Sequence, residues 1–188
     1  EPVFDGQFSN RCYREAVKQA FSHFGEKAIK QGRFDPDMDV ILTEQWARII
    51  MHLPYAFQAK RMFPDLFRHD RKHLDSWNAI EDEIGTAPDE SDFENLDDWD
   101  KEMDGHRRAI SKTESFRQFV EDRIEKGQRA SSLIGNQYTG SIFLALMSTF
   151  EADYDENANL DHTIFGLCGY GSGAKAKVFE AEVQPTWR

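Results

Sequence analysis

The stretch GLCGYGSGAKAKVFEAEV, residues 166–183, is typical of a strand, a glycine-rich turn and a second strand. Its first part continues the apolar run HTIFGLCGY, which favours a buried strand, and the strict alternation of AKAKVFEAEV indicates a half-exposed antiparallel strand. Within the turn, Gly169, Gly171 and Ala174 match the G-x-G-x-x-G/A pattern of dinucleotide-binding proteins. A nucleotide site is therefore the first hypothesis to test.

The nucleotide hypothesis fails on topology. A dinucleotide fingerprint needs a helix after its glycines, because the helix N-terminus holds the pyrophosphate, and here a strand follows. Residues 175–188 also leave no room in this sequence for a crossover helix and a further strand. Two interpretations remain for Gly169, Gly171 and Gly173. They form a tight hairpin with positive φ angles, or their bare backbone N–H groups face a ligand oxygen.

Helices and strands interleave along the rest of the chain. We expect a helix over residues 9–30, a buried strand in WARIIMH that ends near His52, and a helix in YAFQAKRMFPDLFRHD after Pro54. Another helix is expected over 111–127, followed by SSLIGNQYTGS as a turn-rich link and GSIFLALMSTF as an apolar helix buried on most sides. The pattern predicts a single α/β domain, residues 1–188, with helices packed on a sheet.

Charge is unevenly distributed along the chain. The formal net charge is −11, so the surface as a whole would repel a phosphate backbone, and nucleic acid is not an expected partner. Residues 71–108 hold thirteen acids and five bases, a local net charge of −8. We expect a solvated helical excursion anchored by Trp77 and Trp99. A calcium or protein-docking site is the alternative, although the segment has no D-x-D-x-D-G spacing.

The sequence also bears on compartment and metals. No apolar run approaches the roughly 20 residues of a spanning helix, and the N-terminus has no signal-peptide pattern. We therefore expect a cytoplasmic protein without a membrane partner. The cysteines, Cys12 and Cys168, have no C-x-x-C spacing. They are expected to be reduced and structural, and no metal site is predicted.

Four stretches, in the same order over nearly the whole chain, resemble the C-terminal half of hydroxymethylglutaryl-CoA synthase, a thiolase-superfamily enzyme. They are EPVFDGQFSNRCYREAVKQAF at 1–21, MHLPYAFQAKRMF at 51–63, GNQYTGSIFLALMSTFE at 135–151 and GYGSG at 169–173. The resemblance implies a layered αβα half of the thiolase fold with a mixed sheet. It also implies the condensation of acetyl-CoA with acetoacetyl-CoA through an acetyl-cysteine, which gives 3-hydroxy-3-methylglutaryl-CoA and free CoA with no cofactor beyond the substrates.

The same resemblance implies roles for individual residues. His52 of the H-x-P motif would hydrogen-bond the acetoacetyl carbonyl that becomes the tertiary alkoxide, a task that suits an imidazole at a strand end. Asn136 would hold the acyl thioester oxygen or cap the helix that begins near Tyr138, and the two roles are compatible. The backbone N–H of Ser172 would complete an oxyanion hole, and Gly171 and Tyr138 would belong to the same substrate-binding group.

The resemblance is incomplete at some positions. Phe57 stands where the family would have a lysine. Lys60, a later basic position, would meet the CoA phosphates or belong only to a solvated helix face. The nucleophilic cysteine and the catalytic glutamate of the family would precede residue 1. The expected partners are therefore an N-terminal half that carries them, acyl-CoA substrates and a second copy in a homodimer, and the chain alone is expected to be inactive.

Three functions are weighed on this basis. The first is the C-terminal part of a hydroxymethylglutaryl-CoA synthase, which would expose the surface that packs on its other half. The second is a related β-branching synthase that acts on carrier-protein substrates, which the loss of the lysine at Phe57 favours. The third is a non-catalytic thiolase-fold binding module that docks through the acidic segment. The presence of His52, Asn136 and GYGSG together argues against the third.

Overall fold

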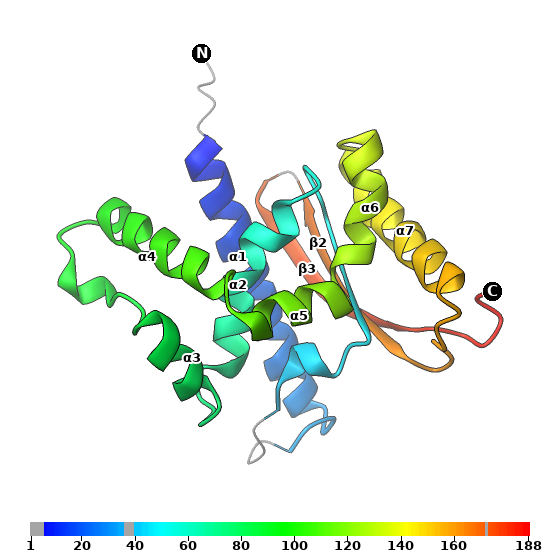
Figure 1. Cartoon of the computed structure of the whole chain (residues 1–188), viewed down its shortest axis with the longest axis horizontal. Helices are drawn as coiled ribbons and strands as arrows, with labels where there is room; N and C mark the ends of the chain where they lie inside the picture. The colour runs from blue at the N-terminus through cyan, green and yellow to red at the C-terminus, as the bar shows by residue number, and fades with distance from the viewer. Residues whose placement is uncertain (1–5, 36–39, 172) are drawn as a thin grey trace.

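The structure is a computed structural model that describes residues 6–35, 40–171 and 173–188. Figure 1 shows a small sheet in the middle of the molecule with helices around it. The helices are α1 (Gly6–Lys30), α2 (Gln58–Arg71), α3 (Trp77–Ile84), α4 (Leu96–Ile110), α5 (Glu114–Arg123), α6 (Glu125–Ile134) and α7 (Ser141–Asp155). The strands are β1 (Arg48–Met51), β2 (Ile164–Gly171) and β3 (Lys175–Glu182), and the short 3-10 helices are Leu42–Glu44, Glu90–Asp92 and Tyr138–Gly140.

The sheet has the strand order β1-β2-β3. Strand β1 runs parallel to β2, with Met51 opposite Cys168, and β3 runs antiparallel to β2, with Lys175 opposite Gly171. The burial of β3 alternates along its length, whereas β2 has four consecutive buried residues. The antiparallel hairpin, the mixed sheet and the α/β class expected from the sequence are confirmed.

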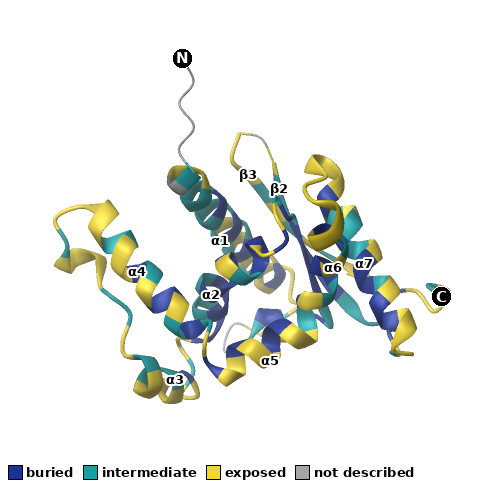
Figure 2. Ribbon diagram, turned by 45° about the horizontal axis from the view of Figure 1, so that its top comes forward, coloured by how far each residue is buried: buried dark blue, intermediate teal, exposed yellow. Residues whose placement is uncertain are grey.

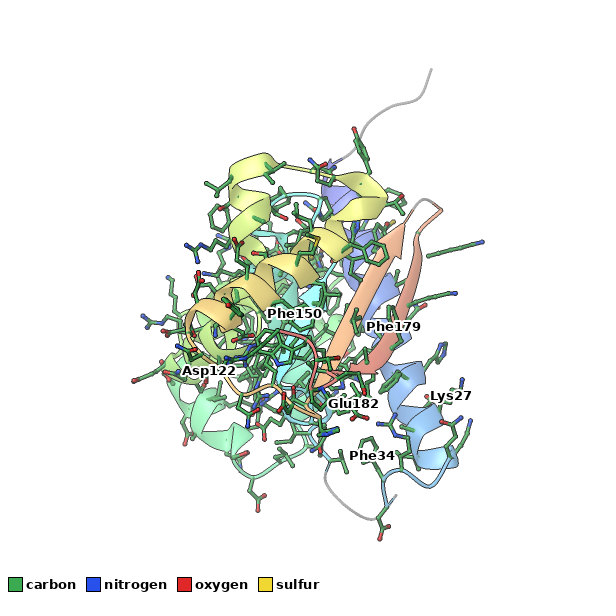
Figure 3. All side chains as sticks on the ribbon, turned by 90° about the vertical axis from the view of Figure 1, so that its right-hand side faces the viewer. Lys27, Phe34, Asp122, Phe150, Phe179 and Glu182 are labelled. Carbon is green, nitrogen blue, oxygen red and sulfur yellow. The ribbon has the colours of Figure 1, made fainter. Side chains whose placement is uncertain are left out.

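Strand β2 lies between two layers of helix. The Tyr170 ring lies 4.6 Å from the ring of Tyr13 on α1, and the Phe165 ring stacks 5.5 Å from the ring of Phe150 on α7. Because successive side chains of a strand point to opposite faces, odd and even residues of β2 meet different helices. Helix α1 therefore covers one face of the sheet and α7 covers the other, and Figure 3 shows Phe150 between α7 and the strands.

The face toward α1 is packed around Trp46, which is fully buried. A Cβ atom added to Gly166 would lie 2.1 Å from Cε3 of this indole, so only glycine fits there. The indole and the ring of Phe21 on α1 form a T-shaped pair at a centroid distance of 5.9 Å. A tight contact between a strand backbone and an aromatic ring fixes how closely α1 approaches the sheet.

Helix α7 differs from expectation in its burial. The sequence predicts burial on most sides, but Phe143 and Met147 are 64% and 68% exposed. The stripe that carries Ala145 and Thr149 is buried, and Figure 2 shows exposed and buried residues alternating along α6 and α7. The prediction of burial on most sides is wrong because the sheet and α6 cover one stripe of an all-round apolar helix, and the opposite stripe lies on the surface.

The expected helix over 111–127 is also corrected, because it is two helices. Helix α5 begins after Thr113, whose hydroxyl accepts the Phe116 N–H at 3.4 Å, and it ends before Ile124, where φ is −119°. Helix α6 then continues to Ile134, so much of the expected turn-rich link is helical. The change of direction lets α6 pack tightly on α7: a Cβ on Gly127 would lie 3.2 Å from Thr149 Oγ1.

The acidic segment contains α3 and α4, which extend away from the sheet in Figure 1. Trp77 is buried with its ring 6.2 Å from that of Phe67, and the Trp99 indole donates to the Pro88 carbonyl at 3.1 Å. The main polar anchor is Arg107, whose guanidinium is buried against three carboxylates. They belong to Asp65 at 2.9 Å, Asp100 at 2.8 Å and Asp104 at 2.7 Å.

Candidate active site

His52 lies directly after β1, where the parallel pairing of β1 with β2 ends. Its backbone N–H donates to the Cys168 carbonyl of β2 at 2.9 Å, which extends the ladder by one residue beyond the strand. Its backbone carbonyl accepts the Tyr13 hydroxyl of α1 at 2.8 Å. The backbone of His52 is therefore held by both the sheet and α1, which fixes the position from which its side chain extends.

The imidazole of His52 is half-buried between α7 and β2. Nδ1 lies 2.7 Å from the hydroxyl oxygen of Ser141, the first residue of α7, and the ring lies 6.3 Å from the Tyr170 ring at a tilt of 49°. Burial lowers the pKa of His52 below its usual value, because an imidazolium is poorly solvated there. The histidine is therefore neutral at pH 7, the form that can donate one ring N–H without carrying charge.

The Asn136–Tyr138 turn precedes α7. The side-chain oxygen of Asn136 accepts the Tyr138 N–H at 2.7 Å, and Tyr138 has a φ of 49° and is 77% exposed. Asn136 thus closes an Asx turn and does not cap a helix as expected, because the cap positions of the 3-10 helix at Tyr138 and of α7 are Gln137 and Gly140. Its role toward an acyl thioester stays a prediction. The turn leads through Gly140 into Ser141, the residue that contacts His52.

The glycine turn joins β2 to β3. Gly171 ends β2, and a Cβ atom added there would meet nothing within 4 Å. Gly173 and Ala174 have φ angles of 77° and 52°, the left-handed conformation that a tight hairpin requires. Ser172, the residue whose N–H is implied in an oxyanion hole, lies outside the described residues. The hairpin interpretation is supported, and a role in ligand binding stays a prediction.

Lys60 lies in a different hollow. It is on α2, and its ammonium contacts the Glu125 carboxylate at 2.5 Å. Both residues line a cleft of about 790 Å³, together with Arg108, Arg117 and the 61% exposed Phe57. The structure therefore brings together His52, the start of α7 and the end of β2. It places Lys60, the residue expected to bind the CoA phosphates, on a separate, cation-lined surface.

Cys168 does not suit a nucleophile. Cys168 is fully buried, and burial raises the pKa of its thiol to about 12, so it carries almost no thiolate at neutral pH. Cys12 is half-buried on α1. Over the described ranges, no group of three or more His, Cys, Asp or Glu side chains could hold a metal ion. Across the same part of the chain, no helix is both long and apolar enough to span a membrane.

Sequence reasoning missed the residues that hold His52. Ser141 occurs inside an apolar run that predicts only a helix, although its place just after the GNQYTG turn marks a helix start. Tyr13 and Tyr170 follow the apolar pattern of α1 and β2, so nothing in the pattern distinguishes their contacts with the histidine from ordinary core packing. Of these three residues, only Ser141 could have been noticed from its position, since a serine at the start of a helix often makes a specific hydrogen bond.

Comparisons with known proteins agree over nearly the whole chain. The family described as "Hydroxymethylglutaryl-coenzyme A synthase C terminal" matches residues 1–187. The hydroxymethylglutaryl-CoA synthase of Haloferax volcanii is 31% identical over 99% of this chain, which spans 40% of that relative. The cytoplasmic hydroxymethylglutaryl-CoA synthase of Mus musculus is 25% identical over 97% of this chain, which spans 34% of it.

Solved structures give the same fold. MvaS in complex with 3-hydroxy-3-methylglutaryl coenzyme A matches with a TM-score of 0.68 and 25% identity, covering 98% of this chain and 37% of MvaS. The HMG synthase of the curacin biosynthetic pathway, in complex with holo donor-ACP, matches with a TM-score of 0.61 over 100% of this chain and 33% of that one. Its identity is 16%, so this second likeness concerns the fold alone.

Proposed function

The chain belongs to the family of hydroxymethylglutaryl-CoA synthase C-terminal regions, and from this we propose that it supplies part of the active site of such a synthase. The reaction condenses acetyl-CoA, acetoacetyl-CoA and water to 3-hydroxy-3-methylglutaryl-CoA and CoA. The observation that carries the proposal is the placement of His52, a neutral imidazole anchored where β1 ends beside β2 and α7 begins. The chain spans about two-fifths of the Haloferax relative, so the rest of the site would lie on another polypeptide segment.

In this proposal His52 donates a hydrogen bond to the acceptor carbonyl oxygen as it becomes an alkoxide. A donor placed where negative charge develops lowers the barrier more than it stabilises the bound ketone. Asn136 and Tyr138, beside the start of α7, and Gly171 with the Ser172 N–H would hold the acyl thioester. Lys60 would meet the CoA phosphates. A cysteine and a glutamate outside this chain would carry the acetyl group and remove the proton from its methyl carbon.

An exposed apolar surface supports a second half. Leu133 and Ile134 at the end of α6 are 83% and 61% exposed, and Phe143 and Met147 of α7 lie among the other large exposed apolar residues. Such a patch on neighbouring helices is typical of a protein-protein contact. We propose that the N-terminal half covers this surface and that the chain alone is inactive. The complete enzyme would be a homodimer in the cytoplasm, as the name of the mouse relative suggests for its location.

The test is an assay of acetoacetyl-CoA-dependent release of CoA from acetyl-CoA. We expect no activity from this chain alone or from a cysteine-bearing N-terminal half alone, and activity from the two together. In the active mixture, His52→Ala should lower kcat at least about a hundred-fold, the usual cost of a lost oxyanion donor. The control is His162→Ala, which removes an exposed histidine paired with Glu182. Activity of the isolated chain, or equal activity of both variants, would overturn the proposal.

A carrier-protein substrate is the second candidate. Phe57 stands where a lysine is expected and is 61% exposed, so one expected cation for the CoA phosphates is missing from the cleft that holds Lys60. The fold likeness to the curacin HMG synthase is compatible with this candidate. Comparing kcat/KM of the reconstituted enzyme for acetoacetyl-CoA and for an acetoacetyl-carrier protein separates the two. A strong preference for the carrier protein would favour the β-branching synthase.

A further inference from the structure

Ser141 stands at the centre of the His52 contacts. It is the first residue of α7 and is fully buried. Its hydroxyl oxygen lies 2.7 Å from Nδ1 of His52 and accepts the Leu53 backbone N–H at 3.3 Å. In the part of the chain that the structure describes, these are the hydrogen-bond partners of this hydroxyl. Ser141 therefore touches both the side chain of the histidine and the backbone that follows it.

The two contacts determine where the hydroxyl proton lies. The Leu53 N–H is always a donor, so it occupies a lone pair of the serine oxygen. If Nδ1 also carried a proton, the serine would accept twice and its own O–H would be buried without an acceptor, which costs about 1–3 kcal/mol. If Nδ1 is unprotonated, the O–H of Ser141 donates to it and every group is satisfied. The imidazole proton then lies on Nε2.

The surroundings also disfavour a doubly protonated ring. An imidazolium would place a proton on Nδ1 and return to the arrangement with an unpaired serine O–H. The N-terminal end of α7, which begins at Ser141, carries a partial positive charge and repels a cation beside it. The aromatic rings of Tyr170 and Tyr13 limit access of water to the same region. Neutral His52 with one fixed tautomer is the state that these contacts favour.

We propose that Ser141 is a positioning residue that holds His52 in the tautomer with the proton on Nε2, so that Nε2–H is the donor presented to a substrate oxygen. The serine acts through the histidine and does not itself touch the reacting atoms. The tautomer follows from the hydrogen bonds of this chain, whereas its use on an acyl carbonyl rests on the proposed function. With the other tautomer, Nε2 would present a lone pair and would repel a developing alkoxide.

The tautomer can be read from the chain itself by nitrogen NMR. We would label the histidines with ¹⁵N, assign His52 by comparison with His52→Gln, and record long-range proton-nitrogen correlations at neutral pH. The expected spectrum shows an unprotonated, pyridine-type Nδ1 and a protonated, pyrrole-type Nε2 for His52. A protonated Nδ1 in the unmodified chain would overturn the proposal, whatever the variants do.

The variants separate positioning from folding. In Ser141→Ala we expect both nitrogens of His52 to shift toward intermediate values, because two tautomers then exchange. Ser141→Thr keeps a hydroxyl and should restore the original spectrum. The matched control is Ser148→Ala: Ser148 is also buried on α7, accepts the Ala130 N–H at 3.1 Å and donates to the Lys126 carbonyl at 2.7 Å. It should leave the His52 nitrogens unchanged.

Activity of the reconstituted enzyme gives an independent outcome. Ser141→Ala should lower kcat at least about ten-fold with a smaller change in KM, since a histidine in the wrong tautomer binds but fails to donate. Ser141→Thr should recover most of the loss. The expected nitrogen spectra without any synthase activity would refute the proposed function and leave the tautomer standing. Synthase activity with unaltered His52 nitrogens in Ser141→Ala would refute the role of Ser141.

Discussion

The sheet and the acidic helices α3 and α4 are stabilised in different ways. In the sheet, the fully buried indole of Trp46 fills the space where Gly166 has no side chain. In the excursion, α4 is held on α2 by the guanidinium of Arg107 and its carboxylate partners, among them Asp65. The contact of Trp46 with Gly166 depends on close packing, and the contact of α4 with α2 depends on ion pairs. The two regions should therefore be destabilised by different changes.

The largest effect is expected from Gly166→Ala. The new methyl group would lie 2.1 Å from Trp46 Cε3, and neither the strand backbone nor the enclosed indole can move away without breaking the contact with α1. The free energy of unfolding should fall by about 3 kcal/mol or more. Urea denaturation followed by circular dichroism measures it. Gly105→Ala, at an exposed position of α4 where nothing lies within 4 Å, should instead stabilise the fold by about 0.5–1 kcal/mol.

A smaller, local effect is expected from Arg107→Met. The change leaves the Asp65 carboxylate, whose side chain is 14% exposed, without its closest cation. The contact between α4 and α2 should therefore lose about 2 kcal/mol of stability, so that α4 opens from α2 more often. Hydrogen exchange should accelerate in α4 and stay unchanged in β2. Arg108→Met is the matched control, because Arg108 is the exposed neighbour on the same helix. Equal acceleration in α4 and β2 would show that the two regions unfold together.

Low pH should destabilise the same helix, α4. Burial alone would raise the pKa of Asp100, but hydrogen bonds from Arg107 and Arg14 and their charges outweigh it and hold this pKa below its usual value. A lowered folded-state pKa gives stability that is complete above the unfolded value of about 3.9 and is lost as the pH falls through the folded value. Protection of the α4 amides should fall below about pH 4. Asp100→Asn should remove this component of the pH dependence.

The smallest effect is expected from Asp97→Asn. Asp97 contacts Arg11 of α1 at 2.7 Å, yet its side chain is 85% exposed. Water and salt screen such a pair, so the free energy of unfolding should change by less than about 0.5 kcal/mol. Urea denaturation at low and high salt checks the value. A loss comparable to that of Arg107→Met would mean that exposed pairs, too, hold the excursion on α1.

The sequence predicts local structure well where one pattern dominates. The alternation in AKAKVFEAEV predicts an antiparallel strand, and the structure pairs this strand with β2 from Lys175 to Glu182. The break at Ile124 could not be predicted, because the apolar face of Phe116 and Val120 continues through it. The break accompanies the close approach of Gly127 to α7, a tertiary contact that leaves no local pattern.

The candidate site also contains residues that could be predicted from the sequence and residues that could not. The H-x-P and GNQYTG motifs point to His52 and Asn136 by resemblance, and the structure places His52 beside the helix that follows the Asn136 turn. The partner of the imidazole could not be predicted, because Ser141 is far from His52 in the sequence and only the packing of α7 on β1 brings them together. The exposure of Phe143 has the same origin, since periodicity cannot tell which side of an apolar helix is covered.

The parallel pairing of β1 with β2 also determines when the site can form. Arg48 pairs with Phe165, so residues 52–163, more than half of the chain, separate the two strands, and α2 to α7 lie between them. Contacts between distant segments form slowly, because a long loop must close before they contribute stability. During synthesis, β1 leaves the ribosome long before its neighbour exists. We therefore expect the His52 backbone to be fixed only after β2 has paired with β1, because its N–H donates to the Cys168 carbonyl.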